Sequence, residues 1–231
     1  MTVSNAIAAT PAEAILSRRS VRAFLPRPVE RGSVERLLDL ARFAANGSNI
    51  QPWQVYVVQG ARRDRLCADI LAADATDAAD YQEDYDYYPS EWFEPYLARR
   101  RLLGKGLYQL AGVAKGDLAA TKAQQARNYV FFDAPVGLFL ALDRRLALGA
   151  WIDIGNFLQT LMIAARGEGL HSCPQQSFSK YHRIVRRHVP IPDQQILVCG
   201  MALGYADPDA AVNQLVPERA PVSEFATFLW D

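Results

Sequence analysis

Three short segments rich in β-branched and aromatic residues set the strongest limit on how this chain can fold. They cover residues 53–59, 136–142 and 195–203, and each has the composition and length of a β-strand. Segments with helical periodicity lie between them, so strands alternate with helices along the chain. This order excludes an all-β fold and predicts a sheet covered by helices, of the α/β or α+β class. With 231 residues, the chain has the length of one domain, or of one domain with an insertion.

Helix boundaries are visible between the strands. Thr10, Pro11 and Glu13 form a capping-box pattern with proline at the first helical position, which predicts a helix of about two turns. Ser33 is expected to cap a second helix, whose apolar stripe contains Val34, Leu37, Leu38, Ala41 and Ala45. Further helices are predicted at 61–75, 117–128, 151–166 and 179–188. Asp153 would open the third of these, where a carboxylate favours the helix dipole.

Residues 76–117 differ from the rest of the chain. Their first part is acidic and crowded with tyrosine, and an aromatic segment and the basic run Arg99–Arg101 follow. So many aromatic residues argue against disorder. We expect an inserted, partly helical excursion that forms a lid or one wall of a pocket. Near the C-terminus, Phe225, Phe228 and Trp230 are expected to pack on another surface, with a partner subunit as one candidate.

The charge balance and the cysteines limit the partners. The 25 basic and 25 acidic side chains cancel, which argues against nucleic-acid binding because that needs a basic excess. No apolar run approaches the roughly 20 residues of a membrane-spanning helix, and no secretory signal is visible. The three cysteines are odd in number and widely spaced, so the sequence favours a reducing cytoplasm. The partner is expected to be a small molecule or a second protein.

Several standard catalytic motifs are absent from the sequence. It contains no glycine-rich dinucleotide fingerprint, no P-loop and no G-x-S-x-G elbow. The three histidines lack metal-ligand spacing, so no metal site is predicted. Cys173 is interpreted as a structural thiol rather than a nucleophile, because nothing near it in the sequence indicates activation. The sequence therefore predicts no catalytic side chain.

The first positive signal is Arg18-Arg19-Ser20-Val21-Arg22, directly after the first helix. Alternate residues of an extended chain point the same way, so Arg18, Ser20 and Arg22 can converge on one ligand. Two guanidinium groups and a hydroxyl suit an anion such as phosphate. A solvated basic turn is the simpler interpretation of this motif alone.

Three other motifs are also weak individually. Gly47-Ser48-Asn49-Ile50-Gln51-Pro52-Trp53 carries amides that suit the imide edge of a heterocycle. Residues 169–176, G-L-H-S-C-P-Q-Q, are expected to form a loop after the long helix. Arg219 is an isolated cation near the C-terminus.

Taken in order, these motifs resemble the FMN-dependent nitroreductase family: R-R-S-x-R, S-N-x-Q-P-W, G-L-x-x-C-P-Q and a terminal Arg-x-Pro. The resemblance spans nearly the whole chain, and the insertion looks like that of the nitrobenzoate-reductase branch. It implies an α+β three-layer sandwich with a central, mostly antiparallel sheet flanked by helices. It also implies an intertwined homodimer of single domains, residues 1–231, each with the insertion at about 76–117.

The resemblance implies roles for the N-terminal motifs. Arg18 and Ser20 would hold the FMN phosphate, with Arg19 near it. Arg22 would approach the pyrimidine edge, where a fixed cation stabilises the anionic reduced flavin. Four polar residues would reach the flavin from a loop that the other subunit supplies: Asn46, Ser48, Asn49 and Gln51.

The C-terminal half would complete the site. Pro174 and Gln175 would cover one face of the ring, and the backbone N–H groups around Gln176 and Ser177 would serve N5 and O4. Arg219 would be a second phosphate cation. Two aromatic residues of the insertion, Trp92 and Phe93, would form the substrate wall, although a core or dimer-interface role is an equally good interpretation of them.

The implied activity is electron transfer from NADPH or NADH through FMN to a nitroaromatic compound, in two alternating half-reactions. The same scaffold supports quinone, enone or halogenated acceptors, and these alternatives stay open. A non-catalytic FMN-binding dimer is a further alternative, as is a chain that binds no flavin.

Overall fold

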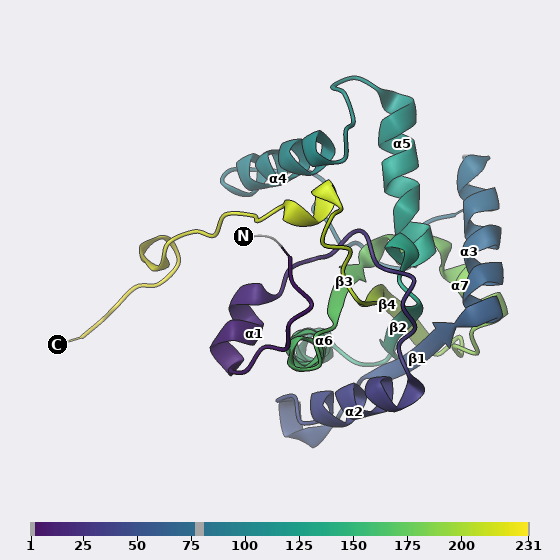
Figure 1. Ribbon diagram of the computed structural model, residues 1–231. Coiled ribbons are helices and arrows are strands. Elements are labelled where there is room, and N and C mark those ends of the chain that lie inside the picture. The colour runs from purple at the N-terminus through teal and green to yellow at the C-terminus, as the bar shows by residue number, and fades with distance from the viewer. Residues whose placement is uncertain (1–2, 77–80, 231) are drawn as a thin grey trace.

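Four antiparallel strands form the centre of the structure, a computed structural model that describes residues 3–76 and 81–230 (Figure 1). The strands are β1 (Gln54–Gln59), β2 (Val136–Asp143), β3 (His171–Gln175) and β4 (Gln195–Gly204), in the order β1-β2-β4-β3. Since every neighbouring pair is antiparallel, the fold belongs to the α+β class rather than the α/β class. The three strands expected from the sequence are confirmed.

The helices form the outer layers of the fold. Their bounds are α1 (Pro11–Ser17), α2 (Arg31–Ala41), α3 (Gly60–Ala75), α4 (Tyr96–Leu110), α5 (Leu118–Ala126), α6 (Leu148–Gly167) and α7 (His182–His188). Alternate residues of β2 enter two separate cores: Leu138 and Leu140 pack with α2 and α6, and Phe139 packs with α3 and α7. The sheet is therefore the middle of three layers, as the sequence predicts.

Helix α1 forms as its capping box predicts, because the Thr10 side chain accepts a hydrogen bond from the Glu13 N–H. The expected cap of α2 is wrong. That helix begins at Arg31, its N-cap is Glu30 without a side-chain bond, and the Ser33 hydroxyl instead accepts from Arg36. Ala45 of the predicted stripe is exposed because the helix has already ended.

Two further predictions need correction. Residues 171–175 are not a loop but the edge strand β3, which tolerates Pro174 because one side of an edge strand makes no ladder bonds. Helix α6 begins three residues before the expected start, so Asp153 lies inside it and is buried. Its carboxylate accepts a hydrogen bond from the Gly47 N–H at 3.2 Å instead of facing the helix N-terminus.

Among the described residues, α6 is the one helix whose length and hydropathy would suffice for a membrane crossing, contrary to the expectation that no apolar run is long enough. Here it is a core helix. Ile154, Phe157 and Leu161 are buried against the sheet. Figure 1 looks almost along its axis, with α1 and α2 beside it.

Residues 84 and 85, which precede α4, are attached to the central sheet and its adjoining loop. Asp84 forms an ion pair with Arg144, and the Tyr85 hydroxyl donates to the Val198 carbonyl. Residues 77–80 of the predicted insertion, two of which are acidic, lie outside the described residues. Beyond α4, the C-terminal tail extends away from the rest of the chain (Figure 1).

A phenylalanine ring fixes the turn after β3 against the sheet. The Phe178 ring lies over Gly200 of β4, where a Cβ would come within 2.4 Å of it. Phe178 also stacks on Phe131, with ring centroids 4.6 Å apart. This packing determines where residues 175–178 lie.

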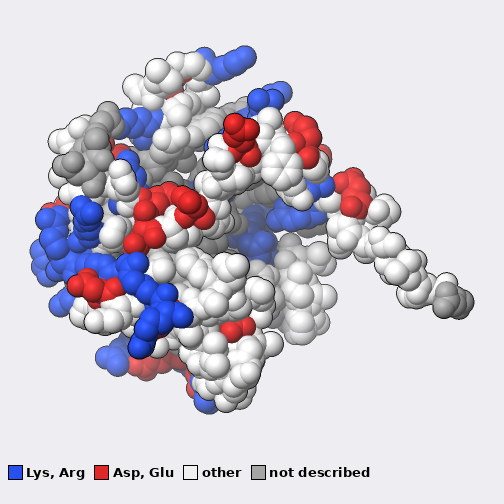
Figure 2. Space-filling model, turned by 180° about the vertical axis from the view of Figure 1, so that it is seen from behind, with Lys and Arg blue, Asp and Glu red and all other residues white. Residues whose placement is uncertain are grey.

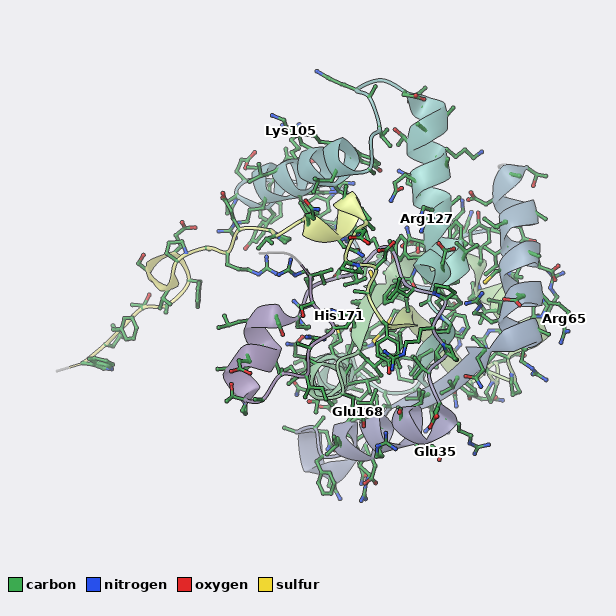
Figure 3. The ribbon with its side chains drawn as sticks, in the orientation of Figure 1. Glu35, Arg65, Lys105, Arg127, Glu168 and His171 are labelled. Carbon is green, nitrogen blue, oxygen red and sulfur yellow. The ribbon has the colours of Figure 1, made fainter. Side chains whose placement is uncertain are left out.

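The N-terminal segment is bound to the end of α6 by a buried arginine. The Arg166 guanidinium donates to the carbonyls of Ser4, Ala6 and Leu170. His171, which Figure 3 labels, has its Nε2 2.8 Å from the Ser4 carbonyl oxygen and 3.0 Å from an Arg166 nitrogen. Burial, and then the Arg166 charge, lower the pKa of His171 from 6.5 to about 4.

This lowered pKa predicts acid sensitivity. The unfolded chain binds a proton at His171 below about pH 6.5, whereas the folded chain resists it until about pH 4. The free energy of unfolding should therefore fall as the pH decreases through this window, by up to about 3 kcal/mol. Denaturant unfolding at several pH values should give a flatter profile for His171→Gln. Parallel profiles for the two proteins would contradict this role of His171.

Candidate functional site

The arginine-rich segment after α1 lies along the outer edge of β3. The Val21 N–H donates to the Ser172 carbonyl at 3.2 Å, and Ser20 forms an isolated β-bridge with Ser172. The extended backbone that the sequence analysis assumed is therefore present. Its alternation directs Arg18, Ser20 and Arg22 toward the same neighbour, the buried Cys173.

The pKa shifts of Cys173 and Arg18 show which charged groups lie near them. Burial raises the pKa of the Cys173 thiol, whereas Arg22, a hydrogen bond with Ser20, and Arg18 act in the opposite direction. Burial, and then the positive charge of Arg219, lower the pKa of Arg18. The structure thus brings Arg219 to the N-terminal motif, although about 200 residues separate them in the sequence.

Among residues 3–76 and 81–230, no carboxylate compensates these cations. Within the described part of the chain, Arg18, Arg22 and Arg219 form no ion pair with an acidic side chain. Figure 2 shows basic side chains in the recess at the base of the C-terminal tail. Like charges that are partly removed from water repel each other, so this arrangement favours a bound anion.

Arg19 points elsewhere, as alternation requires. Its charge acts on Arg166 and His171, and it lowers the pKa of both groups. The structure therefore does not bring Arg19 together with the cluster at Cys173.

The residues at the end of β3 contain polar atoms without partners. The Gln175 amide nitrogen donates to the Asn128 carbonyl at 2.7 Å, but its oxygen is buried and unpaired. The Ser177 hydroxyl is also buried and unpaired, whereas the Gln176 amide donates to Ser179. An unpaired buried polar group costs about 1–3 kcal/mol, so these atoms are suited to a polar ligand.

The amide-rich loop before β1 is strained. Ser48, Asn49 and Gln51 have φ angles of 50°, 57° and 48°, in the left-handed region that side chains other than glycine rarely adopt. Three contacts hold this loop: Gln51 N–H donates to the Asn46 side chain, Gly47 N–H donates to Asp153, and Asn156 donates to the Ala45 carbonyl. Strain that the surroundings maintain in this way is typical of functional sites.

The strained loop is attached to the first half of α6, and the arginine cluster to its C-terminal end. Asp153 and Asn156 hold the loop, whereas Arg166 donates to the hydroxyl of Ser17, next to Arg18. With a rise of 1.5 Å per residue, these attachment points are about 15–20 Å apart along the helix. The points that anchor the two halves of the expected site are therefore well separated along α6.

A cleft of about 450 Å³ adjoins Arg219, between α4 and residues 215–221. Leu102, Leu103 and Leu215 form its apolar walls, and Arg99 links its two sides through an ion pair with Glu224 at 3.0 Å. Sequence reasoning missed these leucines. Their spacing with Arg99 and Gly106 on one face of α4 is the signal that would have found them.

The two aromatic residues expected at the substrate lie outside this cleft. Trp92 packs on Tyr88 with centroids 5.3 Å apart, and Arg100 lies 4.8 Å above its ring. Phe93 is exposed and meets the edge of Tyr96. Their contact with a substrate stays a prediction.

The structure is thus an antiparallel α+β sandwich. Its arginine-lined anion site and strained amide-rich loop are features of a ligand-binding domain. The sequence pattern of the Nitroreductase family matches residues 15–205, so the chain belongs to this family.

Two named relatives match this sequence over almost the full length of the chain. The chain is 38% identical to a chloronitrobenzene nitroreductase of Comamonas testosteroni, over 93% of this chain and 95% of that protein. It is also 38% identical to a 4-nitrobenzoate reductase of Pseudomonas putida, over 93% of each chain.

Solved structures are similar throughout. The FMN- and NADPH-dependent nitroreductase NfnB from Sphigopyxis sp. strain HMH superposes with a TM-score of 0.92 at 38% identity, covering 96% of this chain and 100% of that one. The FMN-dependent NfnB of Mycobacterium smegmatis, in complex with NADPH, gives 0.90 at 33% identity, covering 95% and 98%.

We expect Asp153 to position the strained loop. Asp153→Ala removes the acceptor of the Gly47 N–H, worth about 1–2 kcal/mol, so FMN affinity should fall roughly tenfold. Asp153→Asn keeps an acceptor oxygen and should restore most of the affinity. Fluorescence titration with FMN measures this effect, and the melting temperature controls for general destabilisation. Equal FMN affinity in the alanine variant and the original protein would contradict the assignment.

Proposed function

We propose that this protein is an FMN-dependent oxidoreductase that passes electrons from NADPH or NADH to nitroaromatic compounds. The observation that carries the proposal is the group of Arg18, Arg22 and Arg219, which have no acidic partner among the described residues and suit the charge of a flavin phosphate. The names of the relatives support the acceptor class, and the FMN- and NADPH-dependent structural neighbours support the cofactor and the donor.

The residues present fit FMN. Arg18 and Arg219 would hold the phosphate, and Arg22 would place a positive charge near the pyrimidine edge. The oxygens of Gln175 and Ser177 are buried and unpaired, and in the proposed complex they would supply polar contacts to the flavin ring. When bound, FMN supplies the two-electron redox chemistry, so the chain itself needs no acid–base residue and provides orientation and electrostatics.

The proposal includes a homodimer in which each site takes residues from both chains. The separation of the arginine cluster from the loop at residues 46–51 supports it, because a second chain can supply the missing half. Exposed apolar side chains provide an interface, for example Leu148 and Ile152 of α6, which are 82% and 68% exposed. Along the tail, Phe225, Phe228 and Trp230 are exposed in the same way.

The cytoplasm is the proposed location. Cys67, Cys173 and Cys199 are all buried free thiols, which suits a reducing compartment. Quinones, enones and halogenated compounds remain alternative acceptors, because the apolar cleft beside Arg219 carries no group specific for a nitro substituent.

Anaerobic titration of the purified protein with NADPH tests this function. We expect a yellow protein whose absorbance near 450 nm, roughly where oxidised flavins absorb, bleaches with NADPH and returns when a nitroarene is added. Return of colour with quinones alone would transfer the activity to another acceptor class. A yellow protein that never bleaches would indicate a binding module, and a protein that cannot be loaded with FMN would refute the proposal.

A further inference from the structure

Three backbone groups converge on the side chain of Asn213, a buried residue in a turn near the C-terminus. This turn is the short 3-10 helix Ala211–Gln214, and Asn213 is only 1% exposed. Its amide oxygen accepts a hydrogen bond from the Arg22 N–H at 2.8 Å. Its amide nitrogen donates to the carbonyls of Ala23 and Asp207, both at 2.8 Å. Both donor hydrogens and the acceptor of the amide are therefore engaged.

The backbone at Arg22 meets Asn213 because the chain alternates there. The Val21 N–H donates to the Ser172 carbonyl of β3, and successive N–H groups of an extended chain point in opposite directions. The Arg22 N–H therefore points away from β3. On that side the Asp207 N–H donates to the Ala23 carbonyl at 3.0 Å. The N-terminal motif thus lies between β3 and the residues that follow β4.

The turn that holds Asn213 leads directly to Arg219. Leu215 forms a wall of the cleft beside Arg219, and a Cβ on Gly106 of α4 would lie 3.1 Å from the Leu215 side chain. The turn, yellow in Figure 1, is therefore packed closely against α4. The Arg219 guanidinium donates only within its own segment, to the carbonyls of Pro217 and Glu218. Asn213 thus attaches the segment that carries Arg219 to the backbone of the N-terminal motif.

An uncharged side chain suits this position. Neither Arg22 nor Arg219 forms an ion pair with an acidic side chain among the residues that the structure describes. The asparagine amide fixes the backbone near both cations and leaves their positive charge available to an anion. A carboxylate here would meet two carbonyl oxygens and would cancel part of that charge.

We propose that Asn213 is a positioning residue of the flavin site, which fixes Arg22 and Arg219 relative to each other. One cation then meets the pyrimidine edge of FMN while the other meets its phosphate. The inference rests on the proposed function, which places FMN at these arginines. It adds a residue that touches neither the flavin nor the acceptor and acts through the backbone of Arg22.

The variant Asn213→Ala tests this role, because it removes all three hydrogen bonds and no charge. Riboflavin lacks the phosphate, so the preference of the flavin-free protein for FMN over riboflavin measures the phosphate contact. Fluorescence titration should show that this preference falls about tenfold. The preference for reduced over oxidised FMN should also fall about tenfold, because Arg22 no longer lies at the pyrimidine edge. That change lowers the two-electron midpoint potential by about 30 mV.

Asn5→Ala is the matched control. Asn5 also bonds to the backbone through both ends of its amide, with the Ala206 carbonyl and the Ala206 N–H each 2.9 Å away. It contacts neither Arg22 nor the segment of Arg219. This variant should lower the melting temperature, as Asn213→Ala does, but leave the FMN preference and the midpoint potential unchanged. A milder variant, Asn213→Ser, should give values between those of the original protein and Asn213→Ala.

Two results would overturn the inference. One is an Asn213→Ala variant with the original FMN preference and midpoint potential. The other is equal changes in Asn5→Ala, since general destabilisation would then explain both. If Asn213→Ala does not fold, Asn213→Ser decides by the same criteria.

If the original protein binds no flavin, the proposed function fails, and inorganic phosphate becomes the probe. Thermal stabilisation by phosphate that is lost in Asn213→Ala and kept in Asn5→Ala would support the positioning role. Equal stabilisation of both variants, or stabilisation of neither, would overturn it.

Discussion

The length and burial of α6 are the constraint on which the candidate site depends. One side of this 20-residue helix is fixed in the core by Ile154, Phe157 and Leu161, so its two ends cannot move relative to each other. In its first half, Asp153 and Asn156 hold the amide-rich loop. At its C-terminal end, contacts of Arg166 hold the segment that leads into Arg18. A rigid core helix thus keeps two polar ligand-binding elements about 15–20 Å apart.

The arginine cluster, the unpaired oxygens and the strained loop each cost free energy in the ligand-free protein, and a bound ligand would reduce these costs. Arg18 and Arg219 repel each other and have no acidic partner in the described part of the chain. The Gln175 and Ser177 oxygens are buried and unpaired, and the loop before β1 holds strained residues. Such costs are expected where a fold is organised for binding rather than for its own stability. A phosphate would neutralise the cations, and a second chain would place the loop next to them.

Local sequence signals predicted much of the fold. The capping box at Thr10 and the apolar segments of β1, β2 and β4 depend on neighbouring residues, so a single sequence contains them. Strand β3 was missed because its five residues, HSCPQ, lack strand character and acquire it only by pairing with β4. The cap of α2 was misplaced because Ser33 is a good capping residue that another side chain, Arg36, engages instead.

The candidate site shows the same contrast between local sequence signals and tertiary contacts. The convergence of Arg18, Ser20 and Arg22 followed from strand alternation, and the spacing of the α4 leucines is a local pattern of the same kind. The approach of Arg219 to Arg18 depends on tertiary packing that no local pattern encodes.

Complementation between two inactive variants tests most directly the claim that each site uses two chains. Arg18→Ala would disable the cation cluster, and Asn49→Ala/Gln51→Ala would disable the loop. In a mixed dimer, one of the two sites receives both intact halves, so refolding the two variants together should restore about a quarter of the flavin content and activity. If both halves of a site came from the same chain, every site in the mixture would carry a defect. No recovery above the separate variants would then contradict the account.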